Sequence, residues 1–249
     1  MDERPANPAP SPTSSERARP DGLAWVLFLV IGAGGLAIDL WSKHWAFHTL
    51  GQTARVIVIP GILEWQTMLN RGALFGIGGG YTGVFLTASV LALILVGWMF
   101  TNVPRRQRLL QMALGAILAG AVGNMFDRAY VQLVDKPYAA GNRGPLWLQH
   151  VGEADGLHTL EEYPVGKGGL RITTPTVERE VGFVRDFIKI PTKWWGSTTD
   201  IWPWVFNVAD MLLVGGVSIL AIHLLFERNP KNAEEPGSSP RTELETDAT

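Results

Sequence analysis

The chain has 249 residues, of which 47% are hydrophobic and 18% charged, and its formal net charge at pH 7 is −2. The absence of cysteine excludes a disulfide framework, a thiolate metal site and a thiol nucleophile. The weakly acidic balance without a long basic block argues against nucleic-acid binding. The charges are segregated along the chain, and the four apolar segments that remain predict an α-helical integral membrane protein with four transmembrane helices.

The N-terminal part of the chain predicts a disordered cytoplasmic tail followed by a first membrane span. Residues 1–22 are rich in Pro, Ser and charges, whereas residues 23–38 carry no charge. The span is expected over about 23–42, and a cleavable signal sequence is the alternative. Asp39 and Lys43 at its end are spaced i and i+4, which favours an ion pair on a helix, and such pairs more often fix geometry than perform chemistry.

The segment after the first span predicts a small extracytoplasmic β-sheet on the membrane surface. Residues 55–65 are rich in β-branched side chains around a Pro-Gly turn. Asn70 and Gly72 then suit a turn that delivers side chains towards the helices. Indoles prefer the membrane interface, and seven tryptophans lie at or near the predicted outer interfaces: Trp41, Trp45, Trp65, Trp194, Trp195, Trp202 and Trp204.

The connection between the second and third spans predicts the orientation. The spans are expected over about 81–100 and 109–127, and the short loop 101–108 contains Arg105, Arg106 and Arg108 without any acid. By the positive-inside rule this loop faces the cytoplasm. Both termini are therefore expected in the cytoplasm, and residues 39–81 and 127–200 outside it.

The third span ends in a polar group. Asn124 and Asp127 share a helix face by their i, i+3 spacing, and Arg128 can pair with a nearby acid. Residues 135–181, rich in Gly, His, Glu and Thr, predict an inserted extracytoplasmic lobe or lid. The strand-like segment after it carries Asp186 between apolar neighbours, for which an exposed acid on an edge strand is the plain alternative.

The fourth span, expected over about 203–226, holds a single charge, Asp210. A carboxylate inside a membrane span costs at least about 2.5 kcal/mol on insertion scales, so it is a functional candidate by default. Asn207 precedes it at i, i+3 spacing, which places both side chains on one helix face. A polar pair that only holds helices together is the alternative. Residues 227–249 predict a disordered cytoplasmic tail.

Five short segments resemble, in order, the motifs of the lipoprotein signal peptidase (signal peptidase II) family. They are DLWSK at 39–43, NRGALF at 70–75, GNMFDR at 123–128, VRDF at 184–187 and FNVAD at 206–210. The resemblance implies an aspartic endopeptidase of the bacterial cytoplasmic (inner) membrane, active near the extracytoplasmic face. Its implied substrates are prolipoproteins, cut before a Cys that carries diacylglyceryl, with membrane lipids as surroundings. We expect a monomer without metal or other cofactor.

The resemblance also implies the catalytic pair. Asp210 matches the second catalytic Asp, and Asp186 is preferred for the first over Asp135, which follows Asp127 at nearly the usual family distance but precedes Lys136-Pro137. Substrate-binding or supporting roles are implied for seven residues: Asp39, Lys43, Asn70, Asn124, Asp127, Arg128 and Asn207. Two close carboxylates cannot both ionise readily, so they share a proton and supply both acid and base for amide hydrolysis.

The same residues also allow other functions. A small proton-coupled transporter using Asp210 is the main alternative, although four spans without an internal repeat are few for one. A non-catalytic scaffold is a third possibility. His44 and His48 have i, i+4 spacing, but no Glu completes a zinc-protease motif, and no Gly-x-Ser-x-Gly segment supports serine hydrolysis.

Overall fold

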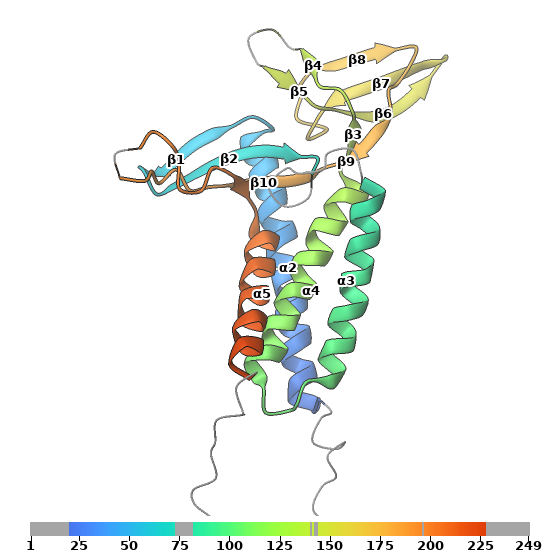
Figure 1. The fold of residues 1–249 in the computed structure, drawn as a ribbon. Coiled ribbons are helices and arrows are strands. Elements are labelled where there is room, and N and C mark those ends of the chain that lie inside the picture. The colour runs from blue at the N-terminus through green and yellow to red at the C-terminus, as the bar shows by residue number, and fades with distance from the viewer. Residues whose placement is uncertain (1–19, 73–81, 140, 142–143, 196, 228–249) are drawn as a thin grey trace, which may run out of the picture.

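The computed structural model describes residues 20–72, 82–139, 141, 144–195 and 197–227, and for 82–86 and 227 only the helical backbone. The two expected tails, except for a few residues next to the helices, lie outside the described residues, as do residues 73–75 of the second motif. In the described part, a bundle of helices carries a β-sheet platform and a separate β lobe at one end (Figure 1).

The bundle consists of α2 (Gly22–Leu50), α3 (Thr82–Asn102), α4 (Arg108–Tyr130) and α5 (Val208–Glu227). Helix α4 is central and packs against the other three. Three of the helices, α2, α4 and α5, are long and apolar enough to cross a membrane, which makes this chain a membrane protein. Helix α2 spans 29 residues, or about 43 Å, so it reaches well past a hydrocarbon layer of about 30 Å.

Close helix contacts depend on glycine. A Cβ atom at Gly120 of α4 would collide with the Ala209 carbonyl oxygen of α5. A Cβ atom at Gly216 of α5 would lie 2.7 Å from the Ala113 carbonyl oxygen of α4. Small residues at such positions let the two backbones approach, as is usual for helices packed within a membrane.

The platform is an antiparallel sheet with the strand order β1-β2-β10-β11. Its strands are β1 (Arg55–Ile59), β2 (Leu63–Asn70), β10 (Val184–Lys189) and β11 (Val205–Phe206). The β1–β2 pair confirms the strand pair predicted around the Pro-Gly turn. Strand β10 lies inside the sheet, between β2 and β11, and all six of its residues are buried. This position rules out the alternative of an acid on an exposed edge strand.

The lobe occupies the predicted insertion. It is entered through β3 (Gln132–Val134) and left through β9 (Glu180–Gly182), and because these two strands pair antiparallel, the inserted chain starts and ends side by side. Within it, β4 (Tyr138–Ala139) pairs with β5 (Pro145–Leu146). A second sheet joins β6 (Leu148–Ala154), β7 (Leu157–Glu162) and β8 (Arg171–Thr174).

The fourth helix corrects the expected span. It begins at Val208 rather than near residue 203, because Val205 and Phe206 pair with Lys189 and Ile188 of β10. Pro203 also disfavours a helical conformation in the residue before it. Asp210 therefore lies in the first turn of α5 and not in the middle of a span.

Candidate active site

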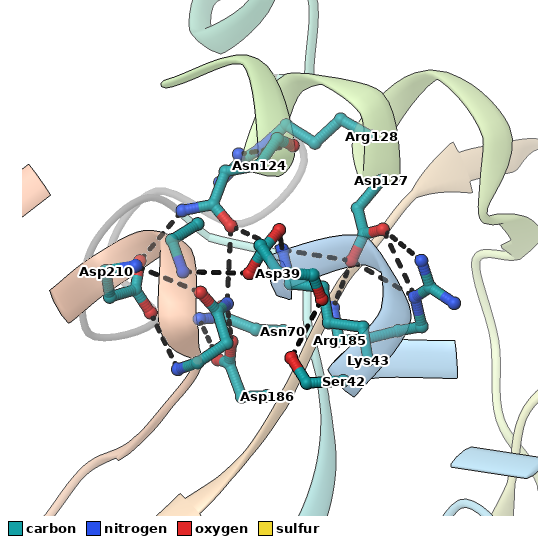
Figure 2. Close-up of polar contacts among 12 residues, drawn as sticks. Asp39, Ser42, Lys43, Asn70, Asn124, Asp127, Arg128, Arg185, Asp186 and Asp210 are labelled. Atoms are coloured by element: carbon teal, nitrogen blue, oxygen red, sulfur yellow. Dashed lines mark hydrogen bonds and ion pairs between the residues drawn. The ribbon is translucent and has the colours of Figure 1, made fainter. Parts of the chain in front are cut away.

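Polar side chains from separate elements meet where the bundle joins the platform (Figure 2). They come from the C-terminal halves of α2 and α4, the end of β2, the middle of β10 and the start of α5. The group contains every residue of the predicted catalytic pair and its seven predicted supporting residues: Asp39, Lys43, Asn70, Asn124, Asp127, Arg128, Asp186, Asn207 and Asp210. Residues spread over most of the chain thus form one connected network.

Asp186 is buried, with a side chain fixed by two amides. Its Oδ2 accepts a hydrogen bond from Nδ2 of Asn70 at 2.9 Å, and its Oδ1 accepts one from Nδ2 of Asn207 at 2.6 Å. The residue is 1% exposed. This burial, reinforced by the nearby Asp210 carboxylate, raises the pKa of Asp186 to about 8. Burial therefore favours the protonated form of the Asp186 carboxyl.

Asp210 and Asn207 form a reciprocal cap at the start of α5. Asn207 Oδ1 accepts a hydrogen bond from the Asp210 backbone N–H at 3.0 Å, and Asp210 Oδ2 accepts one from the Asn207 backbone N–H at 3.3 Å. The hydrogen bonds that cap the helix thus also fix the position of the Asp210 carboxylate. Because the Asn207 amide also binds Asp186, this one residue links the two carboxyl groups.

Asn124 connects the carboxyl pair to a buried cation. Its Nδ2 donates to Asp210 Oδ1 at 2.8 Å, and its Oδ1 accepts from Asn207 at 3.2 Å and from Lys43 Nζ at 3.0 Å. The Lys43 side chain is fully buried and pairs with Asp39 at 2.8 Å, which confirms the i, i+4 ion pair expected on the first helix. Asp39 Oδ1 in turn accepts the Ala209 backbone N–H at 2.8 Å, which fixes the start of α5.

A second buried ion pair flanks the site. Arg185, next to Asp186 on β10, donates from Nη2 to Asp127 Oδ1 at 2.6 Å and from its backbone N–H to Asp127 Oδ2 at 2.9 Å. Lys43 Nζ lies 3.6 Å from the same Asp127 carboxylate. Two cations therefore share one fully buried acid, and the pairing joins β10 to α4.

Arg128 lies on the loop side of the network. Its Nη2 donates to the Gly72 carbonyl oxygen at 2.6 Å and its Nη1 to the Asn124 carbonyl oxygen at 3.2 Å. The guanidinium is attracted by both Asp186 and Asp210. A cation placed here favours negative charge on the carboxyl pair and holds the backbone that follows Asn70.

Other candidates from the sequence lie elsewhere. Asp135 pairs with Arg71 and with Arg179, the latter at 3.8 Å, and makes no bond to Asp210. The rings of His44 and His48 stack with centroids 3.9 Å apart. Within the residues the structure describes, no cluster of three or more His, Cys, Asp or Glu side chains is arranged to hold a metal ion.

Three members of the network were missed by sequence reasoning. In the sequence, Arg185 is a single polar residue within a strand-like segment. Its burial against Asp127 becomes visible only in the folded sheet, where β10 has a partner strand on each side. The Gly72 carbonyl and the Ala209 amide are backbone groups, which a residue pattern does not reveal. The only available signal for Arg185 was that Asp127 needs a cation if it is buried.

The network can be compared with known proteins. The model of the peptidase A8 family, described as signal peptidase (SPase) II, matches residues 31–226, which include the whole polar network. The chain belongs to the signal peptidase II family. Membership accounts for the order of the five motifs and does not favour the transporter alternative.

Known lipoprotein signal peptidases align with nearly the whole chain. A lipoprotein signal peptidase of Rhodopirellula baltica is 31% identical over 236 residues, covering 93% of this chain and 86% of that protein. One of Xanthomonas euvesicatoria pv. vesicatoria is 27% identical, covering 90% and 97%. A solved bacterial membrane enzyme has the same fold, with a TM-score of 0.57 and 21% identity over 88% of this chain and 98% of that one.

Proposed function

We propose that this chain cleaves the signal peptide from diacylglyceryl-modified prolipoproteins, before the lipidated Cys, with Asp186 and Asp210 as its catalytic pair. The observation that carries the proposal is that a buried carboxyl group from β10 and a half-buried one from α5 both accept hydrogen bonds from one residue, Asn207: Asp186 from its side-chain amide and Asp210 from its backbone N–H. Both groups accept hydrogen bonds from neutral donors, the side-chain amides of three asparagines and the Asn207 backbone N–H, and burial raises the pKa of Asp186, which favours a proton held by the pair.

The shared proton supports aspartic chemistry. One carboxylate takes a proton from water as the water oxygen attacks the scissile carbonyl carbon, and the other carboxyl group donates its proton to the carbonyl oxygen. When the intermediate collapses, a proton passes to the leaving nitrogen and the C–N bond breaks. Because coupled carboxyl groups titrate as a unit, either Asp can be the base at the start of a cycle.

Supporting residues hold this arrangement. Asn70, Asn124 and Asn207 each donate an amide hydrogen to an oxygen of the pair, which fixes the direction of the remaining lone pairs. Lys43 acts one step away, because it binds the Asn124 oxygen and so directs the Asn124 amide hydrogens towards Asp210. Arg128 contributes positive charge next to the developing anion.

The choice of Asp186 over Asp135 rests on position. Asp186 shares Asn207 with Asp210, whereas Asp135 is neutralised by Arg71 and Arg179 at the base of the lobe. The long insertion therefore lies between the third motif and the strand that carries the first catalytic Asp.

We propose that all four helices span the membrane, with the platform and lobe outside the cytoplasm. The polar site then lies at the membrane surface, where a lipidated substrate approaches from the bilayer and its scissile bond meets water. The connection between β10 and β11 supports this placement, because Trp194 and Trp195 are 69% and 98% exposed there. Indoles left uncovered by protein favour the membrane interface.

The function is tested on a peptide that contains a diacylglyceryl-modified Cys preceded by a signal sequence. We expect the purified protein in lipid to cut directly before this Cys without added metal. We also expect kcat/KM to fall as the pH rises through about 8, because Asp186 then loses the proton that the pair shares. The readout is mass spectrometry of the products across pH 5–10.

The matched control is the same peptide without the lipid on Cys. A protein that cuts both peptides equally would not be a lipoprotein-specific peptidase. A rate that stays constant from pH 6 to pH 10 would contradict a proton shared within the pair.

The orientation is tested by cysteine labelling, since the natural chain has no Cys to interfere. Asp155 lies in the exposed β6–β7 turn of the lobe, and Asn102 ends α3 at the opposite end of the bundle. In spheroplasts, we expect a membrane-impermeant maleimide to label Asp155→Cys and to spare Asn102→Cys until the cells are lysed. The reverse pattern would contradict the proposed orientation.

A further inference from the structure

The inserted lobe and its root contact the side chain of Arg71, next to the catalytic site. Arg71, which directly follows β2, forms an ion pair with Asp135 at the root of the lobe. Its guanidinium also lies 5.8 Å from the centre of the Trp147 ring, a distance typical of a cation–π contact. Arg71 is thus held from two directions by residues of the lobe and its root.

The residues before and after Arg71 in the sequence both form hydrogen bonds with the catalytic network. Asn70 donates to Asp186 at 2.9 Å, and the Gly72 carbonyl oxygen accepts from Arg128 at 2.6 Å. The Gly72 N–H closes a turn onto Asn70 Oδ1 at 2.9 Å. Any movement of the Arg71 backbone therefore shifts Asn70, which bonds Asp186, and Gly72, which bonds Arg128.

Trp147 is itself fixed to the peptidase core. Its backbone N–H donates to Gln52 Oε1 at 2.7 Å, and its carbonyl oxygen accepts from Gln52 Nε2 at 3.2 Å. Its ring packs on Phe183, which lies just before β10, at a centroid distance of 4.6 Å. The Tyr163 N–H also donates to the Trp147 carbonyl oxygen, at 3.1 Å, and the Tyr163 ring packs on Phe47 at the end of α2.

We propose that the lobe is part of the peptidase machinery: through Asp135 and Trp147 it holds Arg71, and thereby sets the position of Asn70 against Asp186. This inference rests on the proposed function, since it assigns Asp135 and Trp147 as positioning residues for that reaction. Asp135 then has a defined task as an anion, which is different from the catalytic role that its place in the sequence suggests.

The physical basis is the position of Arg71 at the end of a strand. The Arg71 and Asp135 side chains are 36% and 28% exposed, so their attraction is less screened than that of a fully exposed pair. Without these partners the guanidinium would be drawn into water and would pull the backbone between Asn70 and Gly72 with it. Small displacements of groups that orient reacting atoms can cost up to about 100-fold in rate.

Steady-state kinetics with the lipidated peptide test this assignment. We expect Asp135→Asn to lower kcat by about 10-fold with little change in KM, because substrate binding is retained while Asn70 is misplaced. Arg71→Gln should cause a similar loss. Because both substitutions break one contact, the double variant should be no slower than Arg71→Gln alone. Asp135→Glu, which keeps the anion, should restore most of the rate.

The matched control is Asp155→Asn, the same chemical change on the exposed β6–β7 turn of the lobe, which should leave kcat and KM unchanged. Wild-type kinetics for Asp135→Asn, or losses that multiply in the double variant, would overturn the positioning role and leave the proposed function intact. If Asp135→Asn removed all turnover while Asp186→Asn stayed active, Asp135 would be the catalytic residue, and both the positioning role and the assigned pair would fail.

Discussion

Asp210→Asn and Asp186→Asn should each reduce kcat for the lipidated peptide by up to about 10⁴-fold, towards the limit of detection. Each substitution replaces a group that exchanges protons by one that does not, so the pair can no longer act as base and acid in turn. The side-chain volume is nearly unchanged. The loss should therefore appear in turnover, with the protein remaining folded and monodisperse in detergent.

Two further variants separate chemistry from structure in this experiment. Asn207→Ala keeps both carboxyl groups but removes the side-chain amide that bonds the Asp186 carboxyl and caps α5 at the Asp210 N–H, so we expect an intermediate loss of kcat. Asp135→Asn should retain measurable turnover. If Asp210→Asn cleaved at the wild-type rate, the aspartic mechanism would be wrong; if Asp186→Asn alone did so, the first catalytic Asp would have to be sought elsewhere in the chain.

The sequence predicted those parts of the fold that depend on local patterns. Runs of uncharged residues located the helices, β-branched residues around a Pro-Gly turn located β1 and β2, and i, i+4 spacing predicted the Asp39–Lys43 pair. These signals depend on near neighbours along the chain. Hydrocarbon length and helical or strand periodicity were enough to interpret them.

The predicted start of the fourth helix, near residue 203, was wrong because a hydropathy pattern does not detect the residue that caps a helix. Residues 201–206 carry no charge, and the helix that follows carries few, yet Val205 and Phe206 complete a sheet and Asn207 caps the helix. The same limit applies to Arg71 and Trp147. Their contact joins residues far apart in the sequence, and whether a lobe docks on the site depends on tertiary packing that no short motif encodes.

Arg185→Leu should destabilise the folded protein by about 3–5 kcal/mol, because it leaves the fully buried Asp127 carboxylate with a single cation, Lys43, at 3.6 Å. The apparent melting temperature in detergent should fall by about 10 °C for a chain of this size. The Arg185 backbone bond to Asp127 remains, so the variant should still fold at low temperature. Thermal unfolding followed by tryptophan fluorescence measures the shift.

The comparison that isolates the buried charge uses two further variants. Arg171→Leu removes an exposed arginine from β8 of the lobe and should unfold close to the wild-type temperature. The double variant Asp127→Asn with Arg185→Leu removes the unpaired charge, so it should recover part of the lost stability. If Arg185→Leu had the same melting temperature as Arg171→Leu, the buried Asp127 carboxylate would be stable without Arg185. Lys43 would then be its principal partner, and the ion pair would not hold β10 against α4.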